Sequence, residues 1–253
     1  MDSEIEKLKS AIYRYKHLLK GGTIDLEKSL LVEEIEQELM KIARERFASD
    51  EILDKDLLVI IDTIFSDGFL AELVSIASKK LEIPVDDIEQ ALKDFLTGNI
   101  ENNEAKLLFI VIQAIARLKA EHEEIQHGII NLVTDRCQVC GATTRTMTQE
   151  STGYYMICPF CGYKWRVSKG VLTCPFCGNK DPLSLGVFTG KKDRRLGLAW
   201  CQSCDNTWRI ILDERIVKTV PRLFLPVISF GAEIYRGSIE PHREKPNNFS
   251  DNT

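Results

Sequence analysis

CPFCGYKWRV at residues 158–167 and CQSCDNTWRI at residues 201–210 follow the same pattern. In each, a Cys-x-x-Cys pair follows an apolar run, and three residues later comes Trp-Arg and a β-branched residue. Two further pairs, CQVCG at 137–141 and CPFCG at 174–178, are not followed by tryptophan. The four pairs therefore alternate between two forms, which indicates a duplicated unit of two pairs.

These four pairs account for every cysteine of the chain: Cys137, Cys140, Cys158, Cys161, Cys174, Cys177, Cys201 and Cys204. The two thiolates of a Cys-x-x-Cys turn bind one metal ion, and a second pair completes a tetrahedral four-sulfur site. The duplication predicts that the first two pairs hold one ion and the last two hold another. A cross-braced arrangement, first pair with third and second with fourth, is the alternative.

The segments between paired turns, 141–157 and 178–200, are long enough for hairpins that return the chain. We therefore expect two rubredoxin-like, or zinc-ribbon, modules. Such modules have little apolar mass, so metal binding also supplies folding free energy. The glycines that follow the first three pairs are expected to adopt a positive φ: Gly141, Gly162 and Gly178.

Residues 1–130 have apolar side chains at spacings of three and four, which predicts six amphipathic helices in a bundle. Ser49-Asp50, Asp67 and Pro84 are the expected starts of the third, fourth and fifth helices. The sixth is expected to be capped by Asn102 or Asn103 and to run from Ala105 to about His122.

The predicted fold class is therefore α+β and multidomain, with an N-terminal all-α helical bundle followed by two small rubredoxin-like (zinc-ribbon) modules. The expected boundaries are an α-helical domain at 1–131, metal modules at 132–170 and 171–220, a C-terminal packing segment at 221–236 and a disordered tail at 237–253.

Charge is distributed unevenly along the 253 residues. Residues 1–136 carry 17 Lys and Arg against 28 Asp and Glu, whereas residues 137–220 carry 12 against 6. Four thiolates around a divalent ion have a net charge of about −2, so two filled sites would leave the cysteine region only weakly positive. Because nucleic acid binding depends on positive charge, this disfavours a nucleic acid partner.

A zinc-ribbon nucleic-acid-binding protein is nevertheless the alternative function. The cluster Lys191–Arg195 would contact phosphates, although a solvated hairpin tip is the preferred interpretation. Trp165 and Trp208 would stack on bases, although we expect them to cover the cysteine turns or to pack between the modules.

The N-terminus is acidic and polar, and the longest apolar run is too short to cross a bilayer. We therefore expect a cytoplasmic protein with no membrane association, in which thiols stay reduced and bind metal. Thioredoxin-like redox proteins carry a single Cys-x-x-Cys motif, at the N-terminus of a helix that follows a strand. The four pairs of this chain, set among short strands, therefore disfavour a dithiol redox protein. Paired carboxylates, a nucleophile with a histidine, and a phosphate-binding glycine loop are all absent from the sequence, so we expect no enzymatic activity.

The pattern Tyr154-Tyr155-x-x-Cys158-x-x-Cys161-x-x-x-Trp165-Arg166-Val167, followed by Cys174-Pro175-x-Cys177-Gly178, resembles the formate dehydrogenase accessory protein family, FdhE. The spacing between the second and third pairs is the specific part of the match. The helical half matches in layout only, and the segment after Ile210 matches loosely.

This resemblance implies a cytoplasmic maturation factor that assists assembly or activation of the catalytic subunit of formate dehydrogenase, or of a related molybdenum or tungsten enzyme. It implies that the eight cysteines are metal ligands and that the pairs bind iron. Tetrahedral sulfur suits zinc as well, so the expected cofactors are two metal ions, zinc or iron, each bound by four cysteines. The cleft between the helical domain and the ribbons would bind the partner.

Overall fold

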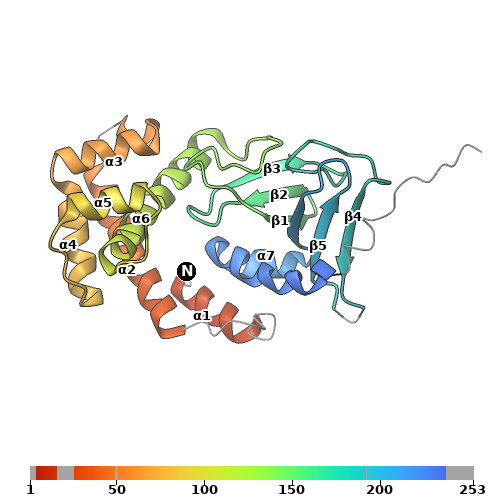
Figure 1. Ribbon diagram of the computed structural model, residues 1–253, viewed down its shortest axis with the longest axis horizontal. Helices are drawn as coiled ribbons and strands as arrows, with labels where there is room; N and C mark the ends of the chain where they lie inside the picture. The colour runs from red at the N-terminus through yellow and green to blue at the C-terminus, as the bar shows by residue number, and fades with distance from the viewer. Residues whose placement is uncertain (1–3, 16–25, 49–50, 192, 238–253) are drawn as a thin grey trace, which may run out of the picture.

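The computed structural model describes residues 4–15, 26–48, 51–191 and 193–237 (Figure 1). The helical half lies on one side of the molecule and the β-sheet on the other, with the C-terminal helices beneath the sheet. The expected helix start at Ser49-Asp50 lies outside the described residues. So does the expected disordered tail, apart from Gly237.

The N-terminal half is helical, as the apolar spacing predicts. Its elements are α1 (Glu4–Tyr15), α2 (Leu26–Arg46), the 3-10 helix η2 (Glu51–Asp54), α3 (Leu57–Ser66), α4 (Phe69–Leu81), α5 (Ile88–Leu96) and α6 (Asn103–His127). The longest of them, α6, packs against α2, α4 and α5. Its buried aliphatic side chains share one continuous core with α2, α3 and α4.

Caps set the ends of the last two of these helices. Asp87 accepts a hydrogen bond from the Gln90 backbone N–H at 2.9 Å, so α5 begins at Ile88 and not at Pro84 as expected. Asn102 caps α6 in the same way, through the Ala105 N–H at 2.6 Å. The helix then continues past the expected end at His122, and the chain turns away at Gly128, whose φ is 65°.

Six strands form one sheet in the order β3-β2-β1-β6-β5-β4. They are β1 (Thr146–Glu150), β2 (Gly153–Ile157), β3 (Lys164–Ser168), β4 (Leu185–Thr189), β5 (Leu196–Cys201) and β6 (Thr207–Ile211). The first three strands form one antiparallel ribbon and the last three form another. The ribbons join where β1 pairs in parallel with β6, with Met147 opposite Ile210. The two repeats therefore share one continuous sheet.

Short helices follow the sheet: α7 (Glu214–Thr219), η3 (Arg222–Phe224), α8 (Leu225–Ser229) and η4 (Phe230–Tyr235). They cover one face of the sheet, where the Ser229 hydroxyl lies 3.2 Å from that of Thr146. These short helices and the sheet enclose a second hydrophobic core. The apolar face of α1, with Leu8 and Ala11, belongs to this core, and Tyr15 hydrogen-bonds to Thr219 at 3.2 Å. The first described helix and the C-terminal helices thus share one core, and they lie beneath the sheet in Figure 1.

Candidate metal centres

The four Cys-x-x-Cys turns share one backbone geometry. In each turn the N–H of the first cysteine donates to the carbonyl five residues later, at 2.9–3.0 Å: Ala142, Tyr163, Asn179 and Asn206. The residue after the second cysteine has a positive φ in every turn. Gly141, Gly162 and Gly178 have φ values of 73°, 73° and 76°, as expected, and Asp205 has 56°. The local sequence therefore builds four equivalent turns that direct thiols inward.

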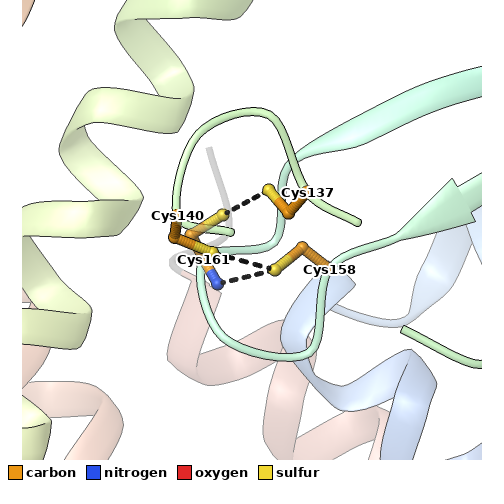
Figure 2. A group of neighbouring side chains, drawn as sticks. All are labelled: Cys137, Cys140, Cys158 and Cys161. Atoms are coloured by element: carbon orange, nitrogen blue, oxygen red, sulfur yellow. Dashed lines mark hydrogen bonds between the residues drawn. The ribbon is translucent and has the colours of Figure 1, made fainter. Parts of the chain in front are cut away.

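The structure groups the cysteines sequentially, and the cross-braced arrangement does not form. Cys137, Cys140, Cys158 and Cys161 make the first centre (Figure 2), and Cys174, Cys177, Cys201 and Cys204 make the second. Within each group all sulfur atoms lie within 4.8 Å of one another. This grouping is the one that the duplication of two alternating pair forms predicts.

Sulfur separations in both groups fit a tetrahedral ion. The first centre has Sγ–Sγ distances of 3.5 Å between Cys137 and Cys161 and 3.4 Å between Cys140 and Cys158. The corresponding distances in the second centre are 3.6 and 3.7 Å. Four sulfurs at metal–sulfur bonds of about 2.3 Å stand about 3.8 Å apart, so each group could hold one metal ion. All eight cysteines are free thiols.

The thiols of the first centre share negative charge. Hydrogen bonds from Cys137 and then Cys140 lower the pKa of Cys158 far below its usual range. Hydrogen bonding to Cys140 and Cys158 raises the pKa of Cys137, and hydrogen bonding to Cys137 raises that of Cys161. Metal binding requires thiolates, so a divalent ion that binds these cysteines displaces their protons.

The second centre has a different electrostatic setting. Burial acts to raise the pKa of Cys201, but hydrogen bonds from the Asn179 side chain and the Cys204 backbone N–H outweigh it and lower that pKa to about 7. Asn179 Nδ2 lies 3.7 Å from Cys201 Sγ, and Asn206 Nδ2 lies 3.4 Å from Cys204 Sγ. Side-chain amides thus lie beside two of the four sulfurs of this centre.

Both tryptophans of the duplicated segments are packing residues. Trp165 is fully buried, stacks on Tyr163 and donates its indole N–H to the Thr134 carbonyl at 3.2 Å. Trp208 is 1 % exposed and its ring centroid lies 6.1 Å from that of Phe176. Neither ring offers a face for stacking on bases.

The basic cluster Lys191–Arg195 lies in the loop that joins β4 and β5, at the expected hairpin tip, with Lys192 outside the described residues. Arg195 forms an ion pair with Asp193 at 2.7 Å. This loop lies between the third and fourth cysteine pairs, and none of its described residues belongs to either cysteine group.

Residues that the sequence did not single out join the first centre to the helical half. The Phe160 ring makes an edge contact with Phe109 of α6, with centroids 5.1 Å apart, and the Phe160 carbonyl accepts the Gln113 amide at 2.8 Å. Behind this turn, Gly162 faces Leu223 of η3, and a Cβ added at Gly162 would lie 3.6 Å from Leu223 Cγ. In the sequence, the one indication of this contact is the apolar Phe160 within the Cys-x-x-Cys turn, where the second repeat has Ser203.

Two adjoining pockets lie where the helical half, the first centre and the C-terminal helices meet. The first, of about 340 Å³, is lined by Cys161, Gly162 and Arg222 among others. The second, of about 470 Å³, is more apolar and is lined by Val32 and Val227 among others. Pro221 and Leu223 line both. Together they form an interdomain groove, defined by these linings.

A buried ion cluster forms part of the groove wall. Arg117 of α6 lies 2.9 Å from Glu33 of α2 and also pairs with Glu36, one turn further along. The Glu36 side chain is 3 % exposed, and its burial raises its pKa to about 7 against the opposing effect of Arg117. One guanidinium thus pairs with two carboxyl groups but balances only one negative charge, and the more buried carboxyl group, that of Glu36, can be protonated near neutral pH.

No protein-family model matches the sequence, and no curated protein matches it. Among solved structures, the crystal structure of the FdhE protein from Pseudomonas aeruginosa is similar, with a TM-score of 0.52 and 15% sequence identity. The similarity covers 97% of this chain and 96% of that one. The resemblance suggested by the cysteine spacing is therefore confirmed at the level of the fold.

In the described parts of the chain, every helix is too short or too polar to span a bilayer.

Proposed function

We propose that this protein is a metal-binding accessory factor, and not an enzyme, that binds the catalytic subunit of a formate dehydrogenase or of a related molybdenum or tungsten enzyme. The observation that carries the proposal is the FdhE-like fold over 97% of the chain, together with two four-cysteine groups. The acidic helical half and the metal modules belong to one molecule with a shared core, so both contribute to one binding surface.

The eight cysteines act in this proposal as ligands of two ions, zinc or iron. Cys137, Cys140, Cys158 and Cys161 hold the first, and Cys174, Cys177, Cys201 and Cys204 hold the second. Thiolates bind both metals in tetrahedral geometry, so availability selects the ion. A bound ion fixes the two turns of each ribbon and supplies folding free energy.

The partner surface is the interdomain groove. It combines apolar walls, from Val32, Leu223 and Val227, with the polar rim of Arg222 and Glu124, which are themselves hydrogen-bonded. A hollow with apolar lining and a few fixed polar groups is the usual form of a binding site. Because Cys161 lines the groove, a partner bound in the groove would contact the first metal centre.

A pull-down from the native host tests this proposal. Tagged protein is expected to enrich a molybdenum- or tungsten-type oxidoreductase subunit. Val32→Asp and Val227→Asp place a charge on opposite walls of the groove and are each expected to reduce the enrichment at least about tenfold, because a buried unpaired charge opposes docking. Leu183→Asp alters an exposed side chain away from the groove and serves as the matched control.

Two outcomes separate the parts of the proposal. Absence of every such subunit from a pull-down with folded, metal-loaded protein contradicts the accessory function. Equal enrichment by the wild type and both groove variants leaves the function standing and places the partner surface elsewhere.

A further inference from the structure

The two metal centres differ in exposure at equivalent positions. Cys140 and Cys177 are both the second cysteine of the first pair in their repeat. Cys140 is half-buried and the other three cysteines of its centre are buried. Cys177 is exposed, and Cys204 of the same centre is half-buried. The duplicated sequence has therefore produced one enclosed centre and one open centre.

A sequence difference at the second turn of each repeat accompanies this asymmetry. In the first repeat, Phe160 packs on Phe109 of α6 and its carbonyl accepts a hydrogen bond from Gln113. The equivalent residue of the second repeat is Ser203, which is exposed and accepts a hydrogen bond from Asn179 at 3.0 Å. The helical half thus contacts a turn of the first centre (Figure 2), whereas Cys177 of the second centre is exposed.

Polar surroundings at the second centre favour a departing thiolate. A thiolate that leaves an ion must be stabilised by water or by hydrogen-bond donors. Cys177 meets solvent, and the amide groups of Asn179 and Asn206 stand beside the sulfurs of Cys201 and Cys204. At the first centre, Val139, Tyr163 and Trp165 provide a buried, mainly apolar surround.

We propose that the second centre exchanges its metal ion, and that the exchange begins at Cys177, whereas the first centre retains its ion as part of the joint with the helical half. An incoming soft donor, such as a thiolate, forms a bond to the ion as the bond from the ion to Cys177 Sγ breaks. The released thiolate takes a proton from water, and no atom changes oxidation state. The inference rests on the metal-binding part of the proposed function and is independent of the partner.

Zinc release and cysteine labelling test this on the full-length, zinc-loaded protein. A chelating dye in excess is expected to remove the ions in two phases of about one ion each, with rates that differ at least about tenfold, because access controls thiolate reactivity. Limiting N-ethylmaleimide, followed by peptide mass spectrometry, is expected to label Cys177 first. Labelling of Cys177 is expected to coincide with the fast phase.

Matched serine variants assign the phases. Cys177→Ser is expected to remove the fast phase and leave the slow ion, whereas Cys140→Ser is expected to remove the slow ion and lower the melting temperature. Should Cys140→Ser fail to fold, the labelling order in the wild type still decides the assignment.

Release of two ions in a single phase, or first labelling at a cysteine of the first centre, overturns the inference while the metal-binding function stands. A protein that holds no ion overturns both. Failure of the pull-down affects neither result, because the release assay contains no partner.

Discussion

Gly162 shows how one backbone position supports both the metal centre and the interdomain contact. Its φ of 73° lies in the left-handed region, and a Cβ there would meet Leu223 at an ordinary contact distance of 3.6 Å. Backbone conformation, and not space, therefore makes glycine the favoured residue. The repeat has Asp205 with a φ of 56° at the same place, which is a residue type that tolerates this region.

Gly162→Ala is expected to destabilise the metal-loaded protein by about 1–2 kcal/mol, the cost of a left-handed conformation with a Cβ. For a chain of this size that lowers the melting temperature by about 2–8 °C, measurable by differential scanning calorimetry. Gly170→Ala, at an open position without positive φ, is the control and should leave the melting temperature unchanged. Equal effects of the two substitutions would contradict the geometric explanation.

Glu36 predicts a pH dependence of stability. Its folded-state pKa is about 7 against a usual value of 4.5, because burial disfavours the charged form. Between pH 4.5 and 7 the folded state therefore holds a proton that the unfolded state has released. The free energy of unfolding then falls as pH rises through this window, by up to about 3 kcal/mol. Below pH 4.5 the stabilisation from this proton is fully present.

Glu36→Gln removes this titration, so the variant should lose that part of the slope in urea unfolding between pH 5 and 8. Glu34→Gln, on an exposed neighbouring position, is the control and should keep the wild-type slope. Metal binding also depends on pH, so the comparison is the difference between each variant and the wild type at each pH. A Glu36→Gln slope equal to the wild-type slope would show that this carboxyl is ionised throughout.

At the scale of elements, the turn between β2 and β3 is the part of the first ribbon that docks on α6. Phe160→Ala removes the contact with Phe109 and is expected to destabilise the protein by about 1–3 kcal/mol. Zinc release from the first centre should quicken as its cover is lost. Stopped-flow release with a chelating dye measures this.

Ser203→Ala changes the same position of the other repeat and is its matched control, with an effect within about 0.5 kcal/mol. Unchanged zinc release in Phe160→Ala would show that the aromatic contact does not enclose the first centre.

Local patterns in the sequence predict the helices, the turns and the grouping of the cysteines. Apolar spacing identifies the helical half, and positive φ at Gly141, Gly162 and Gly178 follows from turn chemistry. Helix ends are less predictable. Pro84 is a plausible first-turn residue, but the Asp87 side chain caps the helix, and such competition between two signals is decided by tertiary packing.

At the scale of the whole molecule, long-range contacts escape the sequence pattern. The parallel pairing of β1 with β6 joins both ribbons into one sheet, and no local motif marks it. Likewise α1 has the periodicity of a bundle helix and contacts α2, but it also shares a core with the C-terminal helices, and Tyr15 hydrogen-bonds to Thr219. An amphipathic face shows that a helix is covered but not by what.

The central claim is that the chain holds two four-sulfur metal ions, and the metal content of the protein tests it most directly. Protein purified anaerobically, then reconstituted with zinc or ferrous iron and freed of excess metal, is measured by mass spectrometry of the elements. The expected result is two ions per chain, one for each group of four cysteines, because each group has the geometry of a tetrahedral site. A content of one ion per chain or fewer would contradict the account.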